Sequence, residues 1–381
     1  MSRATIEVVG VSTENKGAEL MLIAIAQHLR SVKPDIEIAV SQNFGRYEDR
    51  AKYQLRTKLP QSKKAKIGRS WLSSKLMPES FRRAYGLVDD SEVTAVIDAS
   101  GFAFGDQHPA QRTMEFANNV KKWKQAGKPV VMLPQALGPF KTPQIRDAFR
   151  EIVQNVDLVY ARDEVSFAYT SELGHTNNLR KAPDFTNLVK GATTAPCDND
   201  GKRKAFVVPN HRMIEKTAAS ERDQYLPFIA RSIKQLATRG FEPSLLLHDT
   251  NVDETLVAPL QTLLSSSIEV VRAPDPIALK GILGTAAIVV GSRFHALVSA
   301  LSQGVPCLAA GWSHKYEMLF QDYRCPDCIM KTDADETSIA ELIDHITLDI
   351  SFQQSLLKAS RQQIDLAESM WREVDPVLGL N

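Results

Sequence analysis

The sequence has few cysteines for its length, four in 381 residues, at positions 197, 307, 325 and 328. So few cannot form a disulfide scaffold for a chain of this size, which excludes the class of disulfide-stabilised small domains. Cys325 and Cys328 form one C-x-x-C pair, without a second pair or a histidine at zinc-finger spacing. We interpret them as two thiols in a loop, the alternatives being a structural zinc or a redox pair. Cys307 lies in an apolar run and is expected to be a small buried residue.

Long apolar runs are also missing from the sequence. No stretch has the roughly 20 apolar residues that a membrane-spanning helix needs. The first residues, MSRATIEVVGV, lead directly into a strand-like run and lack the apolar core of a signal peptide. We therefore expect a cytoplasmic protein, with peripheral contact at the inner face of the membrane left open.

An excess of one charge is absent as well. The chain has 46 basic and 45 acidic residues, and its formal net charge is +1. This balance gives no support to wholesale nucleic-acid binding, so we expect no nucleic-acid partner.

The segment 61–86 departs from this balance. It carries seven lysines and arginines against one acid, Glu79, and apolar residues such as Trp71 and Phe81 lie among them. A basic segment with apolar anchors can lie on an anionic membrane or hold a lipid diphosphate. The alternative, which we favour, is a solvated basic insertion that packs its apolar residues on its own domain.

Short β-rich runs alternate with amphipathic helical stretches along the whole chain. Strands are predicted at 6–11, 36–40, 94–99, 129–134, 157–161, 179–183, 204–209, 242–248, 268–273, 286–290 and 305–310. This alternation is typical of parallel sheets covered by helices on both faces, so the predicted fold class is α/β.

We expect two Rossmann-like domains that face each other across a cleft. Residues 1–190 would form the first domain and residues 203–352 the second. The polar stretch 189–205, with its glycine, proline, aspartate and asparagine and no periodicity, is the predicted linker. A last helical segment, about 353–374, is expected to pack back on the first domain.

Cations gather where one predicted helix begins. Directly after the strand at 286–290, a helix begins near Arg293 with His295 in its first turn, and Lys315 follows the next strand. In a parallel sheet all three would lie at the carboxyl ends of the strands, where such folds bind ligands. Because the helix dipole disfavours cations here, we predict an anionic ligand held by Arg293 and Lys315, with His295 beside it. The alternative is that Arg293 pairs with a nearby aspartate and His295 simply packs.

Two residues in the first half follow strands in the same way. Arg162 can reach the same cleft from the other domain, the alternative being a salt bridge to Asp163 or Glu164. Asp184 can accept a hydrogen bond from a sugar hydroxyl, orient Arg162 or cap a turn.

Three loops carry further candidates. Asn15 and Gly17 lie in the loop after the first strand, which lacks the G-x-G-x-x-G and Walker patterns of nucleotide sites. Gly101 lies in a glycine-bearing turn. The stretch HDTNVDE (248–254) can hold a metal ion through His248 and its two aspartates, and a loop that contacts a sugar or phosphate explains it equally well.

The chain resembles the polysaccharide pyruvyl transferase family over roughly residues 6 to 325. The resemblance rests on the order of six pieces: ENKGAELML, DASGFAFGD, LPQALGPF, YARDEVSF, APDF and SRFHALVSALSQGVPCLAAGWSHKYEML. It implies a GT-B-like fold and transfer of the enolpyruvyl unit of phosphoenolpyruvate onto two hydroxyls of one sugar, which forms a cyclic ketal and releases phosphate. The acceptor would be a glycan or a lipid-linked oligosaccharide.

The resemblance also implies roles for single residues. His295 would be the catalytic acid, and the donor ligands would be Arg293, Lys315 and, from the other domain, Arg162. Asn15, Gly17, Gly101 and Asp184 are the candidates for further substrate contacts. Where many relatives have Gly-Asp this chain has Gly17–Ala18, so a role for an acid there falls to Glu19 or is lost. The scheme requires neither a metal nor a cofactor.

Two other functions remain open on the sequence. One is a GT-B glycosyltransferase that uses a nucleotide sugar. The other is a sugar-phosphate-binding protein without catalytic activity.

Overall fold

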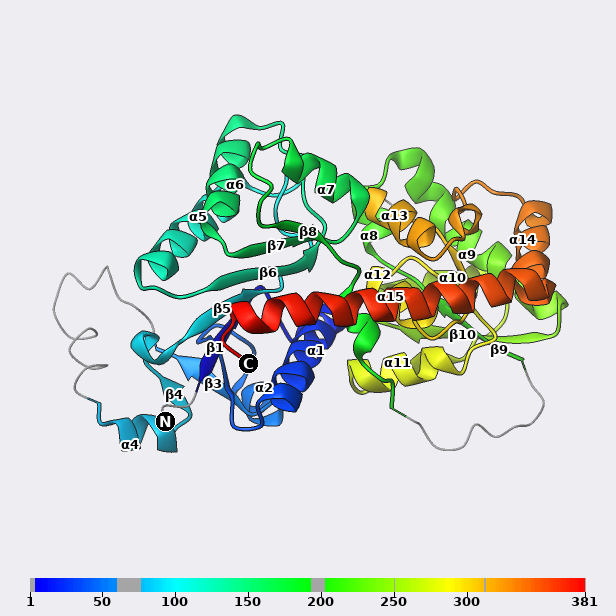
Figure 1. The fold of residues 1–381 in the computed structure, drawn as a ribbon. Coiled ribbons are helices and arrows are strands. Elements are labelled where there is room, and N and C mark those ends of the chain that lie inside the picture. Colours follow the sequence, from blue (N-terminus) through cyan, green and yellow to red (C-terminus); the bar gives the residue numbers. More distant parts are fainter. Residues whose placement is uncertain (1–3, 60–76, 193–202, 250, 312, 381) are drawn as a thin grey trace. The chain divides into compact units, whose positions relative to one another are not determined.

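The computed structural model describes residues 4–59, 77–192, 203–249, 251–311 and 313–380. The chain divides into two compact units (Figure 1). The N-terminal unit comprises Met1–Phe185 together with Glu368–Asn381, and the C-terminal unit comprises Thr186–Ala367.

The N-terminal unit is built on an eight-stranded sheet in the order β4-β3-β2-β1-β5-β6-β7-β8. Every strand pair in it is parallel. Its strands are β1 (Thr5–Val9), β2 (Glu37–Ser41), β3 (Leu55–Lys58), β4 (Leu87–Val88), β5 (Ala95–Asp98), β6 (Val130–Gln135), β7 (Leu158–Ala161) and β8 (Leu179–Lys181). Its helices are α1 (Lys16–Val32), α2 (Tyr47–Lys52), α4 (Glu79–Ala84), η1 (Asp90–Glu92), α5 (Ala110–Gln125), α6 (Pro143–Asn155) and α7 (Glu164–Ser171).

The C-terminal unit is built on a five-stranded parallel sheet in the order β11-β10-β9-β12-β13. Its strands are β9 (Arg203–Val208), β10 (Phe241–Leu247), β11 (Val270–Arg272), β12 (Ile288–Gly291) and β13 (Cys307–Ala309). Its helices are η2 (Phe185–Leu188, from the boundary), α8 (Arg212–Lys216), α9 (Ala219–Thr238), η3 (Asp253–Leu256), α10 (Val257–Leu264), α11 (Pro276–Gly284), α12 (Phe294–Leu301), α13 (His314–Asp322), η4 (Pro326–Cys328) and α14 (Glu336–Leu348).

The central strands are buried on both faces. All residues of β5, β6 and β12 are buried, and their sequences are almost entirely apolar, as expected for parallel strands covered by helices on both sides. In the N-terminal unit, Val120 and Phe149 pack from α5 and α6 against strand residues such as Val96. The predicted α/β class with two parallel sheets is therefore correct.

The eleven predicted strands are all present. Within the described residues, two further strands that were not predicted, β3 and β4, lie at one edge of the N-terminal sheet. β3 has the sequence LRTK and β4 has two residues, so neither carries the apolar run that marks a buried strand. Only one residue of β3 is fully buried, so this strand could form without the apolar run on which the prediction depended.

The last helix, α15 (Ile350–Val377), continues from the C-terminal unit into the N-terminal unit. At its end, the Trp371 ring stacks on His28 of α1 with ring centroids 3.9 Å apart. Asp375 accepts a 2.8 Å hydrogen bond from His28 Nε2. These contacts fasten the end of the chain to the first helix of the N-terminal unit.

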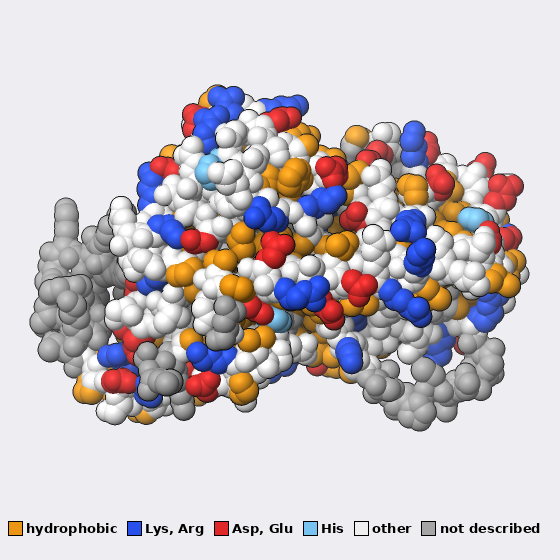
Figure 2. All heavy atoms as spheres, in the orientation of Figure 1, with side chains coloured by type: hydrophobic (Ala, Val, Ile, Leu, Met, Phe, Trp, Pro, Cys, Tyr) orange, Lys and Arg blue, Asp and Glu red, His pale blue; other side chains and the backbone are white. Residues whose placement is uncertain are grey.

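Residues 60–76, most of the basic segment 61–86, lie outside the described residues, as do residues 193–202 of the predicted linker. Membrane contact through 61–86 therefore stays a prediction. Among the described helices, none is long and apolar enough to cross a bilayer. Figure 2 shows acidic and basic side chains interspersed over the face drawn, in keeping with the balanced charge of the sequence.

Candidate functional site

Polar side chains gather at the carboxyl ends of four neighbouring strands of the C-terminal unit. Because the sheet is parallel, these ends share one edge, the edge where open α/β sheets bind ligands. The residues there are Asn210 and His211 after β9, Asp249 and Asp253 after β10, Arg293 and His295 after β12, and Lys315 after β13.

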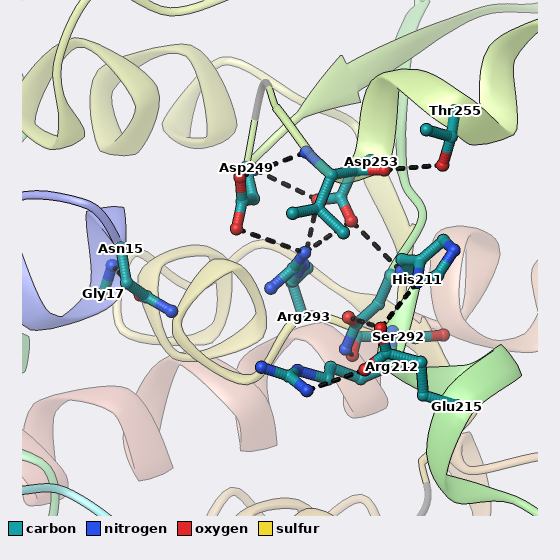
Figure 3. Close-up of polar contacts among 12 residues, drawn as sticks. Asn15, Gly17, His211, Arg212, Glu215, Asp249, Asp253, Thr255, Ser292 and Arg293 are labelled. Atoms are coloured by element: carbon teal, nitrogen blue, oxygen red, sulfur yellow. Dashed lines mark hydrogen bonds and ion pairs between the residues drawn. The ribbon is translucent and has the colours of Figure 1, made fainter.

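Arg293 is engaged by a buried aspartate. Its Nε donates to Asp253 Oδ2 at 2.9 Å, and its Nη2 donates to the other carboxylate oxygen (Figure 3). Arg293 is 8% exposed and Asp253 is fully buried. Asp253 thus supplies the negative charge that the start of α12 requires, which is the alternative that the sequence left open. The position of Arg293 alone is no longer evidence for a bound anion.

The Asp253 carboxylate is held by more than Arg293. It also accepts backbone hydrogen bonds from His211 N at 3.1 Å and from Asp249 N at 3.0 Å. A buried charge is tolerated when it is paired and its remaining lone pairs are satisfied, as they are here. The loops after β9, β10 and β12 are therefore joined through one carboxylate.

The backbone that carries Arg293 is fixed just before it. The Ser292 carbonyl accepts hydrogen bonds from Asn210 Nδ2 at 2.6 Å and from the Tyr316 hydroxyl at 2.9 Å. Arg293 itself is the extended N-cap residue of α12, with φ −97° and ψ 114°. Since Tyr316 follows Lys315 directly in α13, the same bond ties the start of this helix to the loop after β12.

His295 and Lys315 both lie beside the ring of Phe294. The His295 ring meets it edge-on with centroids 5.5 Å apart, and Lys315 Nζ lies 5.3 Å from its centroid, within cation–π distance. Lys315 Nζ also lies 5.4 Å from the Tyr316 ring. His295 and Lys315 are both half-buried. Phe294, which sequence reasoning did not single out, is thus the side chain that brings the two cation-forming residues together.

In the N-terminal unit, Arg162 pairs with Asp184. Arg162 Nη1 donates to Asp184 Oδ2 at 3.1 Å, and both side chains are buried. Asp163 instead caps α7 by accepting from Ser166 N at 2.7 Å, and Glu164 pairs with Lys181. Of the roles open to Asp184 on the sequence, the structure shows the contact that orients Arg162.

The candidate residues near the start of α1 make hydrogen bonds within the N-terminal unit. Asn15 caps α1, because its Oδ1 accepts hydrogen bonds from Gly17 N at 2.8 Å and from Ala18 N at 3.3 Å. Glu19, the acid nearest to the departure at Ala18, accepts hydrogen bonds from Tyr53 Oη and from Lys52 Nζ. Gly101 has φ +68°, a conformation that favours glycine in the turn after β5.

Sequence reasoning missed a buried polar pair at the carboxyl edge of the N-terminal sheet. Asp98, fully buried at the end of β5, accepts hydrogen bonds from Ser100 Oγ at 2.5 Å and from Gln135 Nε2 at 2.7 Å. Burial raises the pKa of the Asp98 carboxyl from 3.8 to about 6, although both hydrogen bonds act to lower it. The sequence feature that could have pointed to Asp98 is its position at the end of the apolar run AVID.

Asp98 makes the stability of the fold depend on pH. Because its pKa is higher in the folded state, the carboxyl contributes stability that is complete below about pH 4 and is lost as the pH rises through about 6. The shift corresponds to ~3 kcal/mol. An asparagine at this position would not titrate, so Asp98→Asn should lack this loss of stability. We therefore expect the difference in free energy of unfolding, Asp98→Asn minus wild type, to grow by about 3 kcal/mol from pH 4 to pH 7. Chemical denaturation of both proteins across this range measures the difference, and parallel curves would contradict it.

The sequence left open a metal ion in the HDTNVDE loop and a structural zinc at Cys325 and Cys328. Within the described ranges, no cluster of three or more histidine, cysteine or acidic side chains could hold a metal ion. In the HDTNVDE loop, Asp253 is committed to Arg293. Cys307, Cys325 and Cys328 are buried thiols, and burial raises the pKa of Cys307. A high thiol pKa keeps a cysteine in its unreactive protonated form.

Comparison with known proteins gives a family and a fold. Residues 15–314 match the family model described as polysaccharide pyruvyl transferase. No curated protein matches the chain.

Solved structures match the chain over nearly its whole length. HepE of Anabaena in complex with UDP and glucose has a TM-score of 0.59 at 14% identity, covering 99% of this chain and 100% of that one. S. aureus MnaA with UDP has a TM-score of 0.60 at 10% identity, covering 100% and 98%. The UDP-GlcNAc 2-epimerase of Neisseria meningitidis bound to UDP-GlcNAc has a TM-score of 0.57 at 12% identity, covering 100% of both. At these identities the likeness shows the two-domain, Rossmann-like GT-B fold and nothing more.

Proposed function

The chain belongs to the polysaccharide pyruvyl transferase family and is an enzyme of polysaccharide biosynthesis, and we propose that it uses phosphoenolpyruvate as donor. The enolpyruvyl unit would move onto two hydroxyls of one sugar, which forms a cyclic pyruvate ketal and releases phosphate. The acceptor would be a glycan or a lipid-linked oligosaccharide.

The observation that carries the proposal is the arrangement of Arg293, His295 and Lys315 at one edge of the C-terminal sheet. Asp253 takes Nε and Nη2 of Arg293 and so fixes the plane of the guanidinium. We assign Nη1 of Arg293 and the Lys315 ammonium to the phosphate and carboxylate of the donor, since both groups form charge-assisted hydrogen bonds with such oxygens. Arg162 of the N-terminal unit, oriented by Asp184, is the further donor ligand that the family implies.

His295 is the proposed acid. Transfer begins when a proton is added to the methylene carbon of phosphoenolpyruvate, which leaves a cation at C2 that a sugar hydroxyl attacks. A protonated histidine is a suitable acid near neutral pH. The second hydroxyl then displaces phosphate, whose developing charge Arg293 and Lys315 stabilise.

Two alternatives are kept for the test. The likeness to structures solved with UDP and with UDP-GlcNAc favours a transferase that uses a nucleotide sugar, although at fold level alone. The third candidate is a sugar-phosphate-binding protein that lacks turnover.

A thermal-shift experiment with phosphoenolpyruvate tests the donor. We expect saturating phosphoenolpyruvate to raise the melting temperature of wild type, because a ligand that binds the native state stabilises it. Lys315→Ala should lose most of the shift. Glu317→Ala, an exposed change two residues further along α13, should keep it. A wild type stabilised by a UDP-sugar and unmoved by phosphoenolpyruvate would replace this proposal with the nucleotide-sugar transferase.

A further inference from the structure

We propose that a cavity at the carboxyl edge of the N-terminal sheet binds the acceptor sugar as an uncharged, hydroxyl-rich ligand, and that Ser100, backed by Asp98, receives the proton of its attacking hydroxyl. This inference rests on the proposed function and adds the acceptor side of the same reaction.

The cavity lies where the winding of the N-terminal sheet reverses. β1 pairs with β2 on one side and with β5 on the other, and the chain reaches β5 only after it has built β2, β3 and β4 outward. At such a switch point the loops after the two strands diverge and leave a crevice for a ligand. Gly10 follows β1 and Ser100 follows β5, and both line the cavity.

The two loops approach each other closely at the floor of the crevice. Gly10 has φ +80°, and a Cβ on it would lie 2.6 Å from the backbone nitrogen of Ser100. Glycine is therefore required at this position by conformation and by space. Because Gly10 has no side chain, the Ser100 hydroxyl stays at the surface of the cavity.

The opposite wall is one face of α5. Arg112, Glu115, Phe116 and Asn119 line the cavity and are spaced i, i+3, i+4 and i+7, which places them on the same side of the helix. The cavity has a volume of about 330 Å³, near the lower end of the ~300–1,000 Å³ range of small-molecule sites.

The chemistry of this wall fits a sugar and not the donor. Arg112 donates hydrogen bonds, Glu115 accepts them and Asn119 does both, while the half-buried Phe116 offers an apolar ring face. One basic and one acidic side chain leave the wall without net charge. Phosphoenolpyruvate, with a phosphate and a carboxylate, would meet the Glu115 carboxylate, whereas a neutral sugar can use every group.

Ser100 and Asp98 form a proton relay at the wall of the cavity, in which the buried Asp98 carboxylate holds the proton. The half-buried Ser100 hydroxyl donates to Asp98 Oδ1 at 2.5 Å, and Gln135 holds the other carboxylate oxygen from behind. With its pKa raised by burial to about 6, the carboxylate is ionised near neutral pH yet basic enough to accept a proton.

The proton balance of the step closes. The sugar O–H bond breaks as its oxygen bonds to C2 of the donor. The sugar proton passes to Ser100 Oγ while the Ser100 proton passes to Asp98 Oδ1. Because Asp98 is fully buried, the proton later returns through Ser100 to water in the cavity. The two reacting sugar hydroxyls lose one proton each. The first makes up for the proton that His295 gives to the methylene carbon, and the second leaves with phosphate.

The binding half is tested with the full-length protein, phosphoenolpyruvate and methyl glycosides of glucose, galactose, mannose, N-acetylglucosamine and N-acetylmannosamine as probes. Saturation-transfer NMR reports binding. We expect at least one glycoside to bind wild type, with affinity at least about tenfold weaker in Arg112→Ala and Asn119→Ala. Asn118→Ala, the same change at the adjacent exposed residue outside the cavity, is the matched control. Absence of binding to wild type, or equal weakening by Asn118→Ala, would overturn the inference.

The proton relay is tested by phosphate release from phosphoenolpyruvate with the glycoside that binds. Ser100→Ala and Asp98→Asn should keep glycoside affinity within about threefold and lower the rate by about 10²-fold or more. We expect the wild-type rate to fall below about pH 6, where Asp98 becomes protonated, and Asp98→Asn should abolish this fall. An unchanged rate and pH profile would refute the relay. Failure of the donor proposal is distinguishable, because wild type would then show no thermal shift with phosphoenolpyruvate. Arg112→Ala, Asn119→Ala, Ser100→Ala and Asp98→Asn should all keep that shift.

Discussion

Asp253→Ala is expected to lower the free energy of unfolding by about 3–5 kcal/mol, the usual cost of removing one member of a buried ion pair. The substitution would leave the Arg293 guanidinium, 8% exposed, without its bidentate partner. It would also leave two backbone N–H groups without their acceptor. Chemical denaturation followed by circular dichroism measures the change.

Asp249→Ala is the matched control for this experiment. Asp249 is the same residue type in the same loop, but its carboxylate lies 3.8 Å from Arg293 Nη2 and is 19% exposed. A longer and more exposed pair contributes at most about 1 kcal/mol. Equal destabilisation by the two substitutions would show that the Asp253 pair is not the feature that holds the three loops.

A double substitution separates the stability of this pair from its role in binding. Asp253→Leu with Arg293→Met replaces both charges by apolar side chains, so the double variant should lose less stability than the two single variants added together. It should nevertheless lose the thermal shift with phosphoenolpyruvate, because the donor ligand is gone. A double variant that is stable and still shifted by phosphoenolpyruvate would remove Arg293 from the proposed donor site.

His295→Ala is expected to lower turnover by about 10²–10⁴-fold, the contribution of a positioned general acid. Phosphoenolpyruvate should still raise the melting temperature of this variant, because the proposed donor ligands are Arg293 and Lys315. Turnover is measured as ketal-linked pyruvate in the surface polysaccharide of a deletion strain of the source organism that carries each variant gene.

His345→Ala is the control, since that histidine is exposed on α14 and pairs with Asp349. It should restore the pyruvate content to the wild-type level. If His295→Ala restored it as fully, His295 would not be the acid and the non-catalytic candidate would gain support. Loss of both pyruvate and the thermal shift would move His295 from proton transfer to donor binding.

The sequence by itself determined the fold class and the edge at which the candidate site lies. Buried parallel strands can be recognised in a sequence as short apolar runs. The residue that follows such a run lies at the carboxyl end of its strand. This local rule placed Arg293, Lys315 and Arg162 at sheet edges. Asp98 obeys the same rule, since it ends the apolar strand β5, but it was not singled out. β3 escaped the rule because a strand with three partly exposed positions has no apolar run to detect.

Only the tertiary structure decided which of these residues are partners. Asp253 lies 40 positions before Arg293 in the chain, Asp98 lies 37 before Gln135, and Arg162 lies 22 before Asp184. Periodicity reports contacts within a helix or strand, whereas each of these pairs joins the ends of two different strands. The strands are β5 and β6, β7 and β8, and β10 and β12, the last two separated by β9 in the sheet. For the same reason, the aspartate that neutralises Arg293 could be anticipated as a class of residue and identified only in the folded chain.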